Sequence, residues 1–145
     1  MGEQKTLRVV AEHADGWNAF PAPIPQLQHK LDVLRAHCDA VGRDYDAIRR
    51  QMGHNVIVRA DAAQVEAEVA RFAAQRGLPL EQARQWAIAG TPEEVAARLA
   101  PYVGIGFDTF LVLERTPLDH ETLRLFMQEV APRLRRAAGP GAETD

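Results

Sequence analysis

Apolar positions recur in steps of three and four along most of the chain, and this spacing predicts amphipathic helices. The clearest stripe consists of Ile24, Leu27, Leu31, Leu34, Cys38 and Val41. Gly42 follows this stripe as a natural helix C-cap. The same spacing predicts helices over residues 3–13, 62–76, 80–89, 92–103 and about 120–134, and a further turn over residues 44–51. Pro132 is expected to bend the last helix or to begin a new turn.

Capping residues support three of these helices. Asp61 is expected to cap the helix over residues 62–76, whose inner face carries Val65, Val69, Phe72, Ala73 and Arg76. Thr91, Pro92 and Glu94 form a capping-box start for the next long helix. Asp119 is the expected cap of the last helix, with Leu123, Phe126, Met127, Val130 and Leu134 facing inward.

Compact apolar runs between the helices predict strands. Met52–Arg59 contains the β-branched run Val56-Ile57-Val58, which is typical of a strand buried on both faces of a parallel sheet. Phe107–Leu113 is a second apolar run, and Ala14–Asn18 is a short third candidate. Because these strands alternate with helices, the sequence predicts an α/β fold built from βα units.

Composition narrows the classes of protein. The chain has 145 residues, 46% of them apolar and 26% charged, which fits one folded domain and excludes disorder over most of its length. No apolar run is long enough to span a membrane, and the single cysteine, Cys38, excludes a disulfide scaffold. The net charge is −3, and because nucleic-acid binding needs a basic surface, no nucleic-acid partner is expected. The start of the chain lacks a secretory pattern, so a cytoplasmic location is expected.

Three segments, in order, resemble the luciferase-like monooxygenase family. Residues 2–18 end in Ala14-Asp15-Gly16-Trp17-Asn18 and resemble the family signature, in which a Gly-Gly-x-Gly loop precedes a helix and then Ala-Asp-Gly-Trp-Asn. Residues 37–44 are similar to the end of the helix that follows this signature. Residues 90–95, together with 106–110, are similar to the last helix and strand of the family fold.

The resemblance implies a partial (β/α)8 TIM barrel. The three predicted strands would be barrel strands six to eight, with residues 1–136 as the C-terminal part of the barrel and 137–145 as a disordered tail. A complete barrel needs about 250 residues and eight strands. Three parallel strands would leave two open sheet edges. We therefore expect a C-terminal portion whose opposite wall is missing.

The resemblance also implies a redox function. Family members are oxidoreductases or monooxygenases that transfer hydride between FMN or coenzyme F420 and a small organic substrate. The isolated chain is expected to be inactive and to need a complementary barrel half or a second copy. Two alternatives stay open: a non-catalytic α/β module that dimerises or docks through its open sheet, and a decayed fragment without function.

Ligands of such folds sit at the carboxyl ends of the strands. The residues expected there, as a substrate-side pocket, are Trp17, Asn18, Arg59, Glu114 and Arg115. Three of them also have a plainer interpretation, in which Trp17 fills core space, Asn18 ends a strand and Arg59 forms a surface ion pair with Asp61. No catalytic residue can be named from the sequence.

The start of the first helix is a candidate cofactor site. Gly2, Glu3 and Gln4 are the remnant of the family's phosphate loop, and a helix N-terminus suits an anion. The plainer interpretation is a frayed helix start, since the other loop glycines are absent and Glu3 repels an anion. The five histidines are scattered, so no metal site is predicted.

Overall fold

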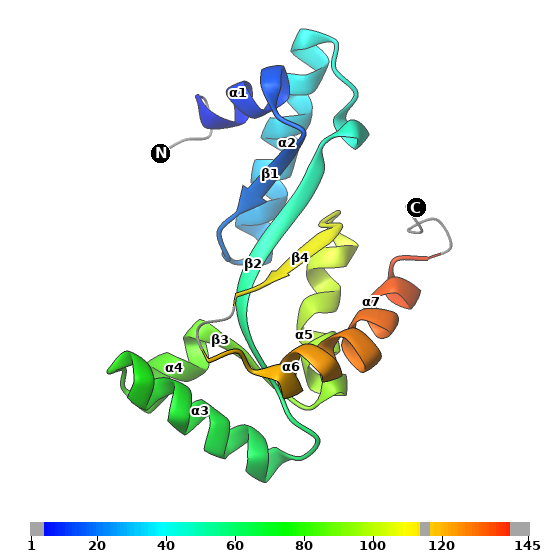
Figure 1. Ribbon diagram of the computed structural model, residues 1–145. Coiled ribbons are helices and arrows are strands. Elements are labelled where there is room, and N and C mark those ends of the chain that lie inside the picture. Colours follow the sequence, from blue (N-terminus) through cyan, green and yellow to red (C-terminus); the bar gives the residue numbers. More distant parts are fainter. Residues whose placement is uncertain (1–4, 114–116, 140–145) are drawn as a thin grey trace. The chain divides into compact units, whose positions relative to one another are not determined.

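The computed structural model describes residues 5–113 and 117–139 (Figure 1). The chain divides into two compact units, Met1–Gly53 with Ile105–Leu111, and His54–Gly104 with Val112–Asp145. Strand β2 (Arg49–Val58) contributes its first half to the first unit and its second half to the other. The proposed phosphate loop at residues 2–4 lies outside the described residues, as do Glu114, Arg115 and the part of the predicted tail from residue 140 onward.

The first unit is a small parallel sheet with two helices. Its elements are α1 (Thr6–His13), β1 (Gly16–Ala19), α2 (Ile24–Val41), a 3-10 turn η1 (Tyr45–Ala47), the start of β2 and most of β4 (Thr109–Val112). β1 runs parallel to β2, with Gly16 opposite Arg49 and Ala19 opposite Met52. β4 also pairs with β2.

The core of this unit follows the predicted stripe of α2. Leu27, Leu34 and Cys38 are fully buried, and Gly42 ends the helix in the left-handed conformation at φ +69°. On the sheet, the Trp17 ring lies 6.0 Å from the Phe107 ring, centroid to centroid. Burial of these side chains holds α2 and the sheet together.

The second unit places a strand pair between helices. It contains the end of β2, α3 (Ala62–Arg76), α4 (Leu80–Trp86), β3 (Ala87–Gly90), α5 (Pro92–Gly104), α6 (His120–Leu125), the π-helical turn η2 (Phe126–Val130) and α7 (Ala131–Ala137). β3 is parallel to β2, with Asn55 opposite Ala87 and Val58 opposite Gly90.

Opposite faces of this strand pair meet different helices, because side chains alternate along a strand. On one face Ile57 and Ala87 form an apolar cluster with Val65, Val69 and Ala73 of α3 and with Ala83 of α4. On the other face the His54 ring packs against Tyr102 of α5, with 5.5 Å between centroids. The second unit is therefore a local helix–sheet–helix sandwich.

The α/β class, the parallel sheet and its covering helices are confirmed, and the sheet of the described residues is not closed. Three local predictions were wrong. The helix predicted over residues 80–89 ends at Trp86, and residues 87–90 form β3, so the described residues contain four strands. β2 starts at Arg49, where a turn was expected. Met127 is 60% exposed.

The exposed Met127 has a physical cause at Pro132. Proline has no N–H and cannot continue the regular helical ladder. The Ala131 N–H accordingly bonds to the Phe126 carbonyl, five residues back, and residues 126–130 adopt the wider π turn. The extra residue in that turn shifts the inward stripe, so that Phe126 and Val130 stay buried while Met127 turns outward.

Candidate functional site

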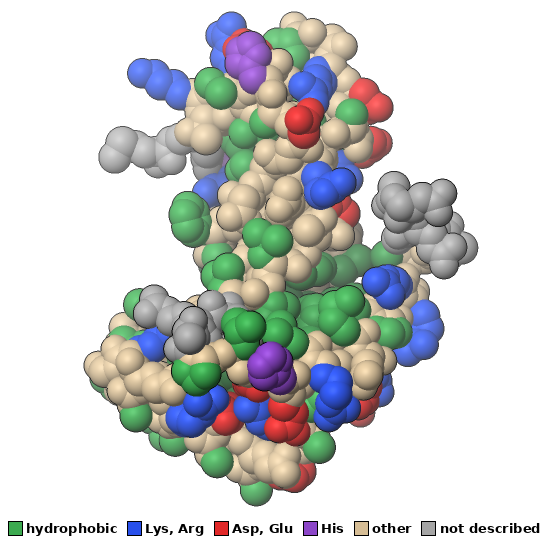
Figure 2. Space-filling model, in the orientation of Figure 1, with side chains coloured by type: hydrophobic (Ala, Val, Ile, Leu, Met, Phe, Trp, Pro, Cys, Tyr) green, Lys and Arg blue, Asp and Glu red, His purple; other side chains and the backbone are tan. Residues whose placement is uncertain are grey.

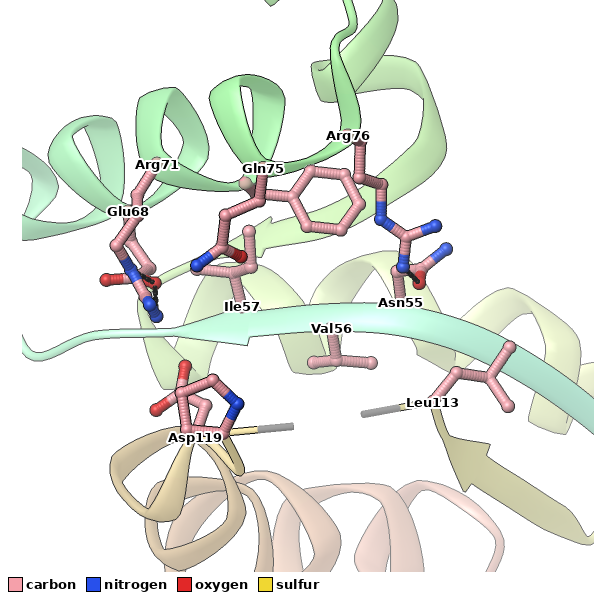
Figure 3. Close-up of a pocket in the computed structure, with 11 residues that line it drawn as sticks. Asn55, Val56, Ile57, Glu68, Arg71, Gln75, Arg76, Leu113 and Asp119 are labelled. Atoms are coloured by element: carbon pink, nitrogen blue, oxygen red, sulfur yellow. Dashed lines mark hydrogen bonds and ion pairs between the residues drawn. The ribbon is translucent and has the colours of Figure 1, made fainter. Parts of the chain in front are cut away.

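A cavity of about 350 Å³ lies between α3 and the second half of β2 (Figure 3). β2 supplies Asn55, Val56 and Ile57, and α3 supplies Glu68, Arg71, Phe72, Gln75 and Arg76. Leu113, Pro117 and Asp119 complete the lining. In parallel α/β folds ligands bind at the carboxyl ends of strands, and this cavity lies toward that end of β2.

The spacing of residues along α3 explains which of its side chains line the cavity. Positions 68, 71, 72, 75 and 76 are separated by steps of three, four or one, so that they share one helix face. In Figure 3 the side chains of Glu68, Arg71, Gln75 and Arg76 point from the helix toward the strand, and the Gln75 amide reaches toward Ile57. The cavity therefore has an apolar wall with polar groups distributed along it.

Hydrogen bonds hold the Asn55 end of the cavity. Arg76 Nη2 donates to Asn55 Oδ1 at 2.7 Å, and Asn55 Nδ2 donates to the Trp86 carbonyl at 3.2 Å. The Arg76 guanidinium also lies over the Phe72 ring, 4.5 Å from its centroid. Such cation–π stacking orients a guanidinium.

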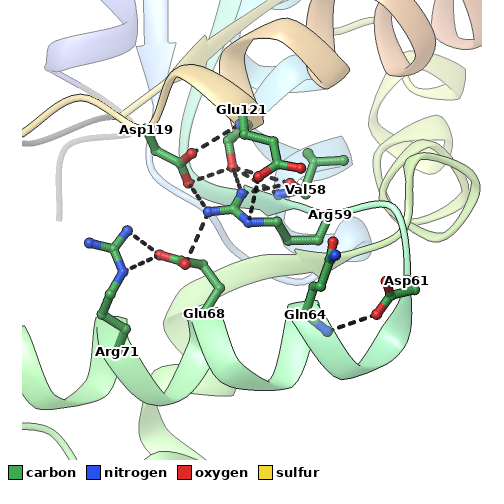
Figure 4. Close-up of polar contacts among 9 residues, drawn as sticks. Val58, Arg59, Asp61, Gln64, Glu68, Arg71, Asp119 and Glu121 are labelled. Carbon is green, nitrogen blue, oxygen red and sulfur yellow. Dashed lines mark hydrogen bonds and ion pairs between the residues drawn. The ribbon is translucent and has the colours of Figure 1, made fainter.

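The other end of the cavity adjoins a buried ion network around Arg59 (Figure 4). Arg59 Nη2 lies 2.8 Å from Asp119 Oδ2 and 3.0 Å from Glu68 Oε2, and its Nε lies 3.5 Å from Glu121 Oε2. Arg59 Nη1 donates to the Val58 carbonyl at 2.7 Å. The side chain of Arg59 is only 8% exposed, so these contacts are shielded from water.

Thr122 joins this network to the strand. Its hydroxyl accepts hydrogen bonds from the Val58 N–H at 3.0 Å and from Arg59 Nη1 at 2.8 Å, and donates to Asp119 Oδ2 at 2.8 Å. Thr122 is fully buried, which makes each of these bonds costly to lose. The network fastens the end of β2 to α3 and to the start of α6.

Electrostatics favour the charged forms of Asp119, Arg59 and Arg71. Burial raises the pKa of Asp119, but hydrogen bonds from Arg59 and from the Thr122 N–H and hydroxyl outweigh it, so the pKa lies below the usual value. Burial lowers the pKa of Arg59, yet Asp119 and Glu68 raise it overall. The hydrogen bond to Glu68 likewise raises the pKa of Arg71.

These contacts correct the expected role of Arg59. The predicted surface ion pair with Asp61 is wrong, because Arg59 is buried and bound to Asp119 and Glu68. Asp61 instead accepts from the Gln64 N–H and caps α3, as predicted. A guanidinium surrounded by three carboxylates serves as a structural clamp, and a ligand phosphate would have to compete with all three.

Trp17 and Asn18, two further predicted rim residues, lie on β1 in the first unit. Trp17 is buried against Phe107, whereas Asn18, on the opposite face of β1, is exposed. The sequence did not single out Asn55, Arg71 or Gln75. The sequence pattern could have indicated this lining, because position 55 falls on a predicted strand, and polar residues 71, 75 and 76 share one side of a predicted helix.

Neither a metal centre nor a membrane span is evident in residues 5–113 and 117–139. They contain no group of three His, Cys, Asp or Glu side chains that could hold a metal ion. None of their helices is both long and apolar enough to cross a bilayer. On the face seen in Figure 2, basic side chains are interspersed with acidic ones.

Comparison with solved structures finds a similar fold in larger proteins. EDTA monooxygenase from Chelativorans sp. BNC1 is similar with a TM-score of 0.77 and 23% identity, over 97% of this chain and 44% of that one. The coenzyme F420 dependent tetrahydromethanopterin reductase from Methanopyrus kandleri gives a TM-score of 0.64 and 17% identity, over 88% of this chain and 48% of that one.

A third similar structure contains a flavin. The oxygenating constituent of 3,6-diketocamphane monooxygenase from Pseudomonas putida, in complex with FMN, gives a TM-score of 0.66 and 14% identity, over 89% of this chain and 45% of that one. At such identities the likeness concerns the fold. The chain spans less than half the length of each of these three proteins.

Sequence comparison identifies the family. Among curated proteins none matches this sequence. The family model described as luciferase-like monooxygenase matches residues 1–77, which is more than half of the chain. The match contains the Ala-Asp-Gly-Trp-Asn segment of β1 and extends past the buried strand β2 to the end of α3. The chain therefore belongs to the luciferase-like monooxygenase family.

Proposed function

We propose that this chain forms the C-terminal part of a luciferase-like oxidoreductase barrel, which transfers hydride between a flavin-type cofactor and a small organic substrate. The observation that carries the proposal is the parallel pairing of β1 with β2, together with the pairing of β4 with the same strand, in a chain that matches the family sequence. Similar structures are named for coenzyme F420 and for FMN, so either cofactor is compatible with the fold.

The open sheet supports the need for a complement. β1 and β4 both pair with β2, and in the described residues neither is paired with a further strand. An unpaired strand edge exposes N–H and C=O groups that readily pair with another chain. Barrel strands one to five would occupy these edges, and we propose that the isolated chain is inactive until they do.

The described residues fit a flavin-type cofactor only in part. Trp17 is packed on Phe107, and the charge of Arg59 is balanced by Asp119 and Glu68, so both side chains are engaged by other residues rather than directed at a ligand. Asn18 is exposed at the carboxyl end of β1, with an amide that can donate and accept hydrogen bonds. We assign to Asn18 the role of orienting a bound ring, while the cofactor supplies the hydride chemistry.

A second candidate function is a non-catalytic docking module. The open edges favour it, and so does Phe20, which directly follows β1 and is 87% exposed. An unpaired strand edge can pair with a strand of another chain, and such a partner would also bury the Phe20 ring. In this alternative a second copy of the chain covers the edge and no cofactor binds.

Cofactor titration separates the two candidates. FMN and coenzyme F420 are each titrated into the purified chain, cofactor fluorescence is followed, and sedimentation gives the oligomeric state. Binding in the micromolar range that weakens in Asn18→Leu supports the oxidoreductase. Stable self-association without binding of either cofactor supports the docking module, and our first proposal then requires that cofactor binding appear once strands one to five are supplied. Gln26→Leu, which changes an exposed amide side chain on α2 to leucine, is the matched control.

A further inference from the structure

We propose that the cavity between α3 and β2 binds an uncharged organic molecule that carries a carboxamide group on an apolar body. The cavity lies within one compact unit, and its volume of about 350 Å³ suits a small organic molecule or one end of a larger one. Identifying that molecule as the substrate rests on the proposed function, whereas binding itself does not.

The formal charges of the cavity lining cancel one another. The charged side chains that line it are Glu68, Asp119, Arg71 and Arg76. Arg59 and Glu121, which adjoin the cavity in the ion network, add one further charge of each sign. The lining therefore offers no net charge to balance a charged ligand, and a partly buried charge without a partner is costly. An uncharged ligand avoids this cost.

The same charged side chains are already bound within the protein. Both acids bond to Arg59. Arg71 Nε donates to Glu68 at 2.6 Å, and Arg76 donates to Asn55. A charged group could bind here only by displacing one of these partners, which would leave that partner without its hydrogen bond.

Gln75 is the polar side chain of the lining that is left to a ligand. Its amide reaches toward Ile57 in Figure 3 and forms no hydrogen bond to the described residues. An amide both donates and accepts hydrogen bonds, so it complements the N–H and C=O groups of a carboxamide. A carboxylate only accepts and an amidinium only donates, so each matches half of the Gln75 amide.

The rest of the lining is suited to an apolar body. Its apolar side chains are those of Val56, Ile57, Phe72 and Leu113. Leu113 is 49% exposed, so a ring that lies against it removes apolar surface from water. The apolar body therefore supplies affinity, and the Gln75 amide selects the group that is attached to it.

The test uses the full chain without cofactor and four probes built on one aromatic ring. Benzamide carries the expected group, benzoate and benzamidinium are its anionic and cationic counterparts, and toluene lacks a polar group. Each probe is titrated while the backbone amide signals of the protein are followed by NMR. We expect benzamide to shift the signals of Ile57, Gln75 and Leu113 saturably and to bind about tenfold more tightly than either ion. An ion that binds as tightly as benzamide, or no saturable binding of benzamide, would overturn the proposal.

Variants of two glutamines on α3 locate the binding. Gln75→Leu should weaken benzamide binding about three- to tenfold, as expected for one hydrogen bond, while toluene binds at least as tightly as before. Gln75→Glu should shift the preference from benzamide to benzamidinium. Gln64→Leu makes the same change on an exposed part of α3 outside the cavity and should leave binding of all four probes unchanged.

The two leucine variants also show how the proposal fails. Equal losses of benzamide binding in Gln75→Leu and Gln64→Leu would place the site elsewhere and contradict the proposal. Thermal melts confirm that each variant is folded. Since no FMN or F420 is present, failure here is distinct from failure of the proposed function.

Discussion

Replacing the buried Arg59 with methionine is the most informative perturbation of the fold. The substitution keeps the length of the side chain but leaves Asp119 and Glu68, whose side chains are 13% and 16% exposed, without their shared cation. It also removes the donors to the Val58 carbonyl and to the Thr122 hydroxyl. Breaking a buried ion pair by removing one partner costs about 3–5 kcal/mol.

The assay is urea unfolding followed by circular dichroism at pH 7. Since small proteins are stable by about 5–15 kcal/mol, the expected loss is a large fraction of the total. Each kcal/mol lowers Tm by about 2–4 °C in a chain of this size, so Tm should fall by about 6–20 °C. Arg84→Met breaks the solvent-exposed pair with Glu66 and should leave Tm nearly unchanged.

The pH dependence of the same variant tests the cause. Hydrogen bonds hold the pKa of folded Asp119 below its usual value, so its contribution is present at neutral pH and is lost as pH falls through that lowered pKa. In Arg59→Met this contribution is gone, so wild type and variant should converge in acid. A deficit below about 1 kcal/mol at pH 7, or one that grows in acid, would refute the clamp.

Three further predictions concern single side chains. Thr122→Val removes a hydroxyl that bonds to Val58, Arg59 and Asp119, and should cost about 1–3 kcal/mol in urea unfolding, with Thr122→Ser retaining most of the stability. Burial lowers the pKa of His54 to about 4, so the free energy of unfolding should be full above pH 6.5 and fall by about 3 kcal/mol toward pH 4. His54→Phe should flatten the pH dependence of this free energy between pH 6.5 and 4, and an unchanged slope would contradict the assignment to His54. Gly77 has φ +61°, so Gly77→Ala should lower Tm by a few degrees, for a cost of about 1 kcal/mol, while a Tm equal to wild type would show that the turn relaxes.

Helix caps and the apolar faces of helices could be predicted from the sequence. The α2 stripe, the Asp61 cap and the Thr91–Glu94 capping box all appear in the structure. Such features depend on residues within one helical turn of each other, so that neighbouring residues suffice to predict them.

Strand β3 could not be predicted in the same way. Ala87, Ile88 and Ala89 continue directly from a helix, and alanine itself favours helix. Pairing with Asn55–Val58, some thirty positions earlier in the chain, overrides this preference. Tertiary pairing of this kind leaves no local mark in the sequence.

The candidate site shows the same limit. Arg59 was correctly placed at the end of a strand, but its partner was sought at Asp61 rather than at Asp119, sixty positions away. The α3 stripe was interpreted as core because Phe72 and Arg76 share its face with Val65 and Val69. Only the fold shows that one side of this face covers an apolar cluster and the other lines a cavity.

Complementation tests the central claim most directly. The chain is mixed with a polypeptide that carries barrel strands one to five of a luciferase-like protein, and FMN and F420 binding is measured with and without it. Our account predicts a one-to-one complex that binds one of the cofactors at least tenfold more tightly than the chain alone. If the two polypeptides do not associate, or if association leaves cofactor binding unchanged, this chain is not the closing part of a redox barrel.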